Sequence, residues 1–163
     1  KYHNIVVLRT FSKVHSLPSL RVGYLISASQ DVRDAISLYR PMFPLSWFSL
    51  FLARIASIDE EHVQNARKNL LVHRERLYKQ LDALKTFSYV PSQTNTLMLR
   101  NVRLEASDLS QALAQRGFLT ANLNRVNGLQ GHNFLRMTIC CEEDNDRFIA
   151  ASQEIEQTGE GGD

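Results

Sequence analysis

The stretch that decides the fold lies near the start of the chain and reads Val6-Val7-Leu8-Arg9-Thr10-Phe11-Ser12-Lys13, then, after a short polar gap, Leu20-Arg21-Val22-Gly23-Tyr24. The apolar, largely β-branched run at residues 4–9 predicts a buried strand of a parallel sheet. A polar loop follows at residues 10–19. Residues 20–26 predict a second strand, and Gly23 inside it is typical of a place where two backbones approach closely.

The rest of the chain alternates between helical and strand patterns. Apolar residues at helical spacing predict helices at residues 31–40, 46–58 and 60–84. Short apolar runs predict strands at residues 87–90, 95–100 and 133–139. Ser107 is the expected N-cap of a further helix that ends at Gly117, and the acidic residues from Glu142 suit the first turn of a last helix. The second half therefore predicts a compact α/β sandwich.

Two features predict that the chain belongs to a larger body. The helix at residues 46–58 is apolar nearly all round, which is typical of a helix buried in a large protein or at an interface. The chain also starts without Met and enters a strand at once. We therefore expect it to be cut from a longer protein, with a missing domain or a second subunit covering this helix.

Composition excludes several classes of function. The 163 residues carry a net charge of only +2, which gives no basic field for nucleic acid. The five histidines are scattered, so no cluster has metal-ligand spacing. The only two cysteines, Cys140 and Cys141, are adjacent and do not suit a disulfide with each other, which favours the reducing cytoplasm. No apolar run is long enough to span a membrane.

The loop between the first two strands carries the chemistry. Thr10, Ser12 and Lys13 place two hydroxyls and an amine directly after a strand, and Arg21 follows. A lysine at a strand end can be partly desolvated, which favours the neutral amine that reacts with an aldehyde. Hydroxyls and a guanidinium suit a phosphate group. From spacing alone, a surface lysine and a structural arginine remain the alternative.

These residues resemble the cofactor-lysine motif of the fold-type I aminotransferases, which depend on pyridoxal 5′-phosphate. The resemblance is closest to the histidinol-phosphate aminotransferase and threonine-phosphate decarboxylase group. It continues in sequence order through four more segments: Pro44-Leu45-Ser46, Pro91-Ser92-Gln93-Thr94-Asn95, Leu135-Arg136-Met137-Thr138-Ile139, and Glu143-Asp144-Asn145-Asp146-Arg147-Phe148. It implies an α/β fold consisting of the end of a large cofactor domain, residues 1–42, and a small C-terminal domain, residues 43–163.

The resemblance also implies roles for single residues. Lys13 corresponds to the lysine that binds the cofactor and moves the substrate proton. Thr10, Ser12 and Arg21 correspond to ligands of the cofactor phosphate, and Arg136 to the arginine that binds the substrate α-carboxylate. The complete protein is then expected to be a cytoplasmic homodimer that exchanges amino groups between an amino acid and a 2-oxo acid. The chain alone, which lacks the family's other cofactor ligands, is expected to be inactive.

The chain departs from the family pattern at several positions. Pro18-Ser19 replaces the small residues that usually precede the arginine of the motif, and Cys140 replaces a common glycine. Ala121 stands where phosphate-binding relatives carry an arginine, although Arg125 lies only four residues on. We therefore predict a non-phosphorylated aliphatic or aromatic amino acid as substrate. The adjacent cysteines are expected to be small buried packing residues.

Three other functions remain open at this point. The first is a decarboxylase that uses the same cofactor, because it shares the lysine and the arginine. The second is a non-catalytic, aminotransferase-like regulatory domain, which requires a winged-helix segment upstream. The third is an unrelated α/β binding module, for which the order of the motifs is accidental.

Overall fold

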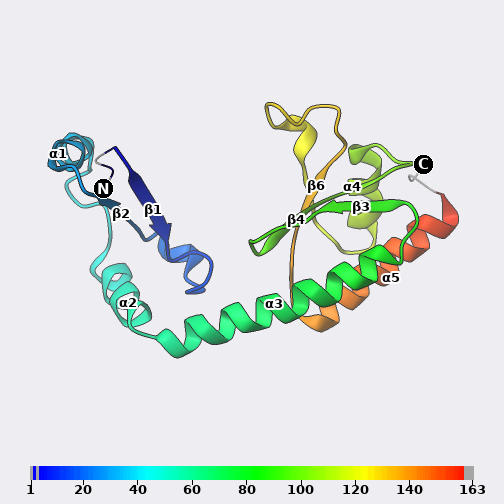
Figure 1. Cartoon of the computed structure of the whole chain (residues 1–163), viewed down its shortest axis with the longest axis horizontal. Coiled ribbons are helices and arrows are strands. Elements are labelled where there is room, and N and C mark those ends of the chain that lie inside the picture. The colour runs from blue at the N-terminus through cyan, green and yellow to red at the C-terminus, as the bar shows by residue number, and fades with distance from the viewer. Residues whose placement is uncertain (1, 3, 160–163) are drawn as a thin grey trace. The chain divides into compact units, whose positions relative to one another are not determined.

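The computed structural model describes Tyr2 and residues 4–159, which form two compact units that divide between Arg67 and Lys68 (Figure 1). Each unit has its own sheet, two-stranded in the first and four-stranded in the second. The α/β class predicted from the sequence is confirmed. The predicted boundary between residues 42 and 43 refers to the domains of a longer protein and stays a prediction.

The first unit contains a β-hairpin-like pair of strands and two helices that follow it. Its elements are β1 (Val6–Thr10), the short 3-10 turn η1 (Pro18–Leu20), β2 (Gly23–Ser27), α1 (Gln30–Leu38) and α2 (Trp47–Ser57). Serine side chains begin both helices: the Ser29 hydroxyl accepts a hydrogen bond from the Val32 amide, and the Ser46 hydroxyl accepts one from the Ser49 amide. These are the N-cap contacts that satisfy the free amides of a first turn.

The first two strands pair with each other in antiparallel orientation. Val6 lies opposite Ser27 and Thr10 opposite Gly23. All five residues of β1 are exposed among the described residues, so the predicted burial in a parallel sheet of a larger protein stays a prediction. An apolar run indicates burial on both faces in a complete sheet, but it contains no information on the direction of the neighbouring strand.

The apolar core of the first unit is small. Phe11, Val22 and Ala53 form it, with Leu17, Leu20, Leu45 and Ala56 packed around them. Most apolar side chains of α2 lie outside this core, and Trp47, which stacks on Phe51 at 5.1 Å between ring centroids, is 75% exposed. The predicted all-round apolar helix is therefore present, and the described residues cover little of it.

The second unit is a four-stranded antiparallel sheet with helices. α3 (Glu60–Asp82) starts in the first unit and continues into the second. The remaining elements are β3 (Phe87–Val90), β4 (Thr96–Asn101), α4 (Ala106–Gln115), β5 (Ala121–Asn122), the 3-10 turn η2 (Leu123–Arg125), β6 (Leu135–Thr138) and α5 (Glu142–Thr158). The order of strands across the sheet is β3-β4-β6-β5.

One face of this sheet is buried and the other is open. Along β4, Leu97 and Leu99 are fully buried, whereas the alternating residues Thr96, Met98 and Arg100 are only partly covered. The buried side chains join α3, α4 and α5 in one core, with contributions such as Leu77, Leu113 and Phe148. Side chains alternate between the two faces of a strand, so this pattern places the three helices on one face.

Three local details differ from the sequence predictions. Glu105, not Ser107, is the N-cap residue of α4, and the Ser107 hydroxyl donates to Asp108 instead. The two-residue strand β5 was not predicted, because it is too short to show a periodicity. Cys140 and Cys141 are both exposed, so the prediction of buried packing residues is wrong.

A side chain holds the backbone where β6 ends. Asn145 is 2% exposed, and its amide group accepts a hydrogen bond from the Cys140 amide at 3.1 Å and donates one to the Cys140 carbonyl at 2.9 Å. The turn between β6 and α5 is thereby fixed through the backbone. Across the described part of the chain, no helix combines the length and the apolar character needed to cross a membrane.

Candidate active site

The turn after β1 brings two hydroxyls together. The Thr10 and Ser12 hydroxyl oxygens lie 2.9 Å apart, and the Ser12 amide donates to the Thr10 hydroxyl at 3.0 Å. The Thr10 hydroxyl is also 3.5 Å from the Val22 carbonyl oxygen. Short side chains that bond to a nearby amide are typical of tight turns. Both hydroxyls are therefore held at one place at the end of the strand.

Phe11 anchors this turn to the unit. Its ring is 7% exposed within the small core, and it packs on His15 at 4.7 Å between ring centroids. Its amide donates to the Val22 carbonyl, and its carbonyl accepts from the Leu17 amide. Because Phe11 faces inward, the flanking residues Thr10 and Ser12 face outward. In the sequence, an aromatic residue between two polar residues is the pattern that indicates this arrangement.

Lys13 follows this anchored segment and is exposed. Its carbonyl accepts a hydrogen bond from the Ser16 amide, which closes a turn directly after the lysine. His62, in the first turn of α3, contacts the same loop through a 3.0 Å hydrogen bond between Nε2 and the Val14 carbonyl. Lys13 is exposed in this chain, and the predicted partial desolvation of its amine in the complete protein stays a prediction.

Arg21 directly follows η1 and lies two residues before the start of β2. It adopts a left-handed backbone conformation with φ of 54°, which is uncommon for a residue with a side chain. One guanidinium nitrogen donates to the Pro18 carbonyl at 2.7 Å, and the side chain is otherwise exposed. The other guanidinium N–H groups therefore remain available to a ligand.

The pairing of β1 with β2 connects these two sides. Thr10 is opposite Gly23, two residues after Arg21. A Cβ added to Gly23 would lie 2.7 Å from the Arg9 carbonyl oxygen, closer than real Cβ atoms approach backbone. The predicted close approach of backbones at Gly23 is thus confirmed. Thr10, Ser12 and the Arg21 segment belong to one end of the strand pair.

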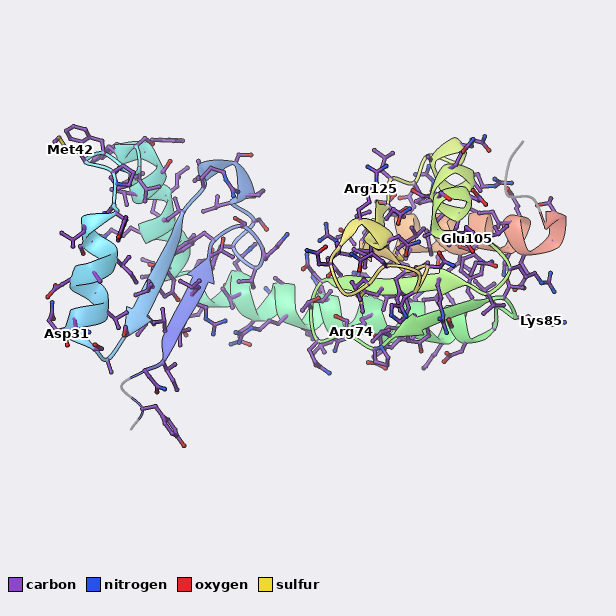
Figure 2. The ribbon with its side chains drawn as sticks, turned by 90° about the horizontal axis from the view of Figure 1, so that it is seen from above. Asp31, Met42, Arg74, Lys85, Glu105 and Arg125 are labelled. Atoms are coloured by element: carbon purple, nitrogen blue, oxygen red, sulfur yellow. The ribbon has the colours of Figure 1, made fainter. Side chains whose placement is uncertain are left out.

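Arg136 belongs to the second unit. It lies on β6 with an exposed side chain on the open face of the sheet, between Met98 on β4 and Ala121 on β5. None of the ion pairs between described residues involves Arg136. Arg125, labelled in Figure 2, lies exposed at the end of η2.

Arg100 was missed by the sequence analysis and lies on the same open face. It is two residues from Met98 on β4, and its guanidinium lies 5.3 Å from the centroid of the Phe134 ring. Its Nε donates to the Ser88 hydroxyl on β3 at 3.2 Å. The signal that could have found it is the period of two along residues 95–100, which places Met98 and Arg100 on one face.

The Cys140 thiol next to β6 is a weak nucleophile. Partial desolvation of its sulfur, followed by the nearby Asp144 and Cys141, raises the pKa of the Cys140 thiol above its usual value, although the residue as a whole is exposed. A raised pKa keeps the thiol protonated at neutral pH, whereas the thiolate is the nucleophile. The described residues contain no group of three or more His, Cys, Asp or Glu side chains arranged to hold a metal ion.

Comparison with known proteins identifies the family. The model of the aminotransferase class I and II family matches residues 1–151 of the chain. A histidinol-phosphate aminotransferase from Methanocaldococcus jannaschii is 32% identical over 155 residues, which is 95% of this chain but 41% of that protein. The chain therefore spans less than half the length of this curated relative.

Solved structures show the same fold. A histidinol-phosphate aminotransferase from Clostridium acetobutylicum superposes with a TM-score of 0.91 at 18% identity, covering 96% of this chain and 47% of that one. The enzyme from Sinorhizobium meliloti, solved in complex with pyridoxal-5′-phosphate, gives a TM-score of 0.79 at 22% identity, covering 97% and 42%. The chain has the α/β fold of one portion of a fold-type I enzyme, and it belongs to the aminotransferase class I and II family.

Proposed function

We propose that this chain is the C-terminal portion of a pyridoxal 5′-phosphate-dependent aminotransferase that exchanges amino groups between an amino acid and a 2-oxo acid. The observation that carries the proposal is the group of donors at the end of the β1–β2 pair: the two hydroxyls 2.9 Å apart, with Lys13 directly after them. They occur in a chain that belongs to the aminotransferase class I and II family. The 32% identity to a histidinol-phosphate aminotransferase supports the same reaction class.

The residues present fit the cofactor. Thr10 and Ser12 supply hydroxyl donors, and Arg21 supplies guanidinium N–H groups that the Pro18 carbonyl leaves free. Together they match a phosphate, which binds best to charged, planar donors and hydroxyls. Lys13 supplies a primary amine, the group that reacts with an aldehyde. The exposure of Lys13 leaves this amine accessible to a bound cofactor.

The proposed roles follow from these donors. When bound, pyridoxal phosphate supplies the electron-accepting ring that stabilises the charge left at the substrate Cα. Lys13 would hold the cofactor through its amine and, once the substrate amine has displaced it, its free amine would move the proton at the substrate Cα. Thr10, Ser12 and Arg21 hold the phosphate in place. The buried ring of Phe11 anchors the backbone segment that carries Lys13 and the two hydroxyls.

Arg136 is proposed to bind the substrate α-carboxylate. Its planar fork of N–H donors matches a carboxylate, and no described acidic residue neutralises it. Its neighbour across the strand pair is Ala121, which offers no donor to a second anionic group. This register supports the prediction that the complete enzyme does not prefer phosphorylated amino acids, because a phosphate requires several charged donors.

The proposal extends to the complete protein. The exposed apolar side chains of α2 support a homodimer, in which protein outside the described residues covers that helix. The two free cysteines support a cytoplasmic location. We expect the 163-residue chain alone to have no aminotransferase activity, because the family's further cofactor ligands lie outside the motif segments that it contains.

Reductive trapping of the cofactor tests the proposal. The complete enzyme, loaded with pyridoxal phosphate, is treated with borohydride, and the labelled peptide is mapped. We expect the label on Lys13 and its loss in Lys13→Arg. The matched control is Lys68→Arg, an exposed lysine on α3, which should keep the label. A label on another lysine, or a folded wild-type enzyme that takes up no label, contradicts the assignment.

A further inference from the structure

The open face of the four-stranded sheet presents two arginines in adjacent positions. In one cross-strand row, Val90, Met98, Arg136 and Ala121 are register partners across β3, β4, β6 and β5. In the neighbouring row, Ser88 is the partner of Arg100, whose guanidinium lies over Phe134. Arg100 and Arg136 are thus diagonal neighbours on one face, a separation of about 7–8 Å that long side chains can bridge.

No acidic side chain on the sheet balances this pair. The sequences of the four strands contain two arginines and no Asp or Glu. Elsewhere in the described part of the second unit, Arg76, Arg116 and Arg147 each form an ion pair with a helix carboxylate. Arg100 and Arg136 form none. Three arginines outside the sheet are thus paired with carboxylates of the same unit, whereas no described carboxylate pairs with either sheet arginine.

Arg100 is oriented before any ligand arrives. Its Nε is occupied by the Ser88 hydroxyl at 3.2 Å, and its plane is fixed over the Phe134 ring. Two contacts on a half-buried side chain reduce the rotamer entropy that binding would otherwise cost. The terminal Nη groups keep their donors, because no described residue accepts a hydrogen bond from them. The geometry leaves one edge of the guanidinium open.

We propose that Arg100 is a second substrate-binding arginine, which binds an acid group on the side chain of the substrate while Arg136 binds the α-carboxylate. This inference rests on the proposed function and replaces the aliphatic or aromatic substrate predicted from the sequence with a short acidic one. One open guanidinium edge matches one carboxylate through two parallel hydrogen bonds. A phosphate would require more donors than Arg100 and Ala121 provide, so the second group is a carboxylate.

Binding of small acids to the 163-residue chain tests the inference without cofactor or activity. Succinate, butyrate and 3-phosphonopropionate are titrated while the arginine Nε–H signals are followed by NMR, with assignments from Arg100→Lys and Arg136→Lys. We expect butyrate to shift only the Arg136 signal and succinate to shift both. Succinate should bind about tenfold more tightly than butyrate, the value of one charge-assisted contact. Arg100→Gln should abolish this preference and leave butyrate binding unchanged.

Each outcome has a defined meaning. The matched control is Arg116→Gln, an arginine paired with Glu154 on the helical side, which should keep the tenfold preference. If succinate shifts Arg136 but not Arg100, the inference fails and the proposed function stands. If no acid shifts Arg136, the assignment of the substrate carboxylate in the proposed function also fails. If 3-phosphonopropionate binds more than tenfold more tightly than succinate, the second group is a phosphate and our choice of a carboxylate is wrong.

Discussion

The two sheets of this chain are held together by different interactions. The β1–β2 pair is exposed along β1, and its core consists of Phe11, Val22 and Ala53 with a few partly buried neighbours. The four-stranded sheet packs one face against three helices, and its two central strands, β4 and β6, alternate strictly between buried and open positions. Backbone pairing and turn hydrogen bonds stabilise the first sheet, whereas apolar burial stabilises the second.

The two sheets also differ in the functions proposed for their residues. The residues proposed to hold the cofactor are on the weakly covered sheet, and the residues proposed to recognise the substrate are on the strongly covered one. Local stability follows apolar burial and contact density. We therefore expect the β1–β2 pair to open more readily than the second unit, and substitutions should affect the two sheets unequally.

The largest expected effect is a cavity in the second unit. Leu135 is fully buried on β6, so Leu135→Ala should lower the free energy of unfolding of that unit by about 2–5 kcal/mol. Urea unfolding followed by circular dichroism measures the change. Leu8→Ala on β1 is the control, because Leu8 is 74% exposed and should change the stability by less than about 0.5 kcal/mol. Equal losses for both variants would contradict the contrast between the sheets.

A smaller effect is expected at the strand pairing of the first unit. Gly23→Ala places a methyl group 2.7 Å from the Arg9 carbonyl oxygen, so β1 and β2 must separate locally. We expect a loss of about 1–3 kcal/mol in the local opening free energy, measured by hydrogen exchange of the Phe11 amide, which donates to Val22. Amides of β4 serve as the internal control. Unchanged exchange at Phe11 would show that the pairing tolerates a side chain at residue 23.

The smallest expected effect is a pH dependence of the stability of the second unit, which arises from Glu156. Burial acts to raise the pKa of Glu156, but hydrogen bonds from the Thr86 amide and hydroxyl and from the Lys85 amide outweigh it, so the net pKa is lowered. A lowered folded-state pKa stabilises the second unit above the unfolded-state value, and this contribution is lost as the pH falls through the folded-state pKa. Glu156→Gln should cost about 1 kcal/mol at neutral pH and nothing in acid.

Thermal unfolding of both variants across the acidic range measures this dependence. Glu154→Gln is the matched control on the same helix, since Glu154 forms an exposed pair with Arg116 that contributes little. The stability difference between wild type and Glu156→Gln should shrink as the pH falls. A difference that stays constant with pH would show that the Glu156 carboxylate is not charged in its contact with Thr86.

Much of the fold could be predicted from periodicity, because burial in the second unit follows the sequence pattern. All five predicted helices and the predicted strands β1, β2, β3, β4 and β6 are present within a few residues of their expected positions. The errors occur where the pattern contains no information. The run at Val6–Thr10 could not reveal an antiparallel partner, and the two residues of β5 span only a single repeat of a strand.

The candidate site divides in the same way. Thr10, Ser12 and Lys13 are consecutive in the turn, so their proximity follows from the sequence itself. The period of two places Arg100 on the same face as Met98, but its relation to Arg136 depends on the register between β4 and β6, which the sequence does not show. The predicted desolvation of Lys13 stays a prediction, because strand-end position does not determine which residues cover a side chain. Assignments that depend on cross-strand register thus require the structure.

The contact between Asn145 and the chain after β6 has a consequence for sequence evolution. Asn145 forms hydrogen bonds with the amide and the carbonyl of Cys140, as a neighbouring strand would. Neither hydrogen bond involves the Cys140 side chain. The turn can therefore keep its shape while residue 140 drifts from glycine to cysteine or to another small residue. The mutational constraint therefore falls on Asn145 in the helix, and the side chain of residue 140 in the turn is free to vary.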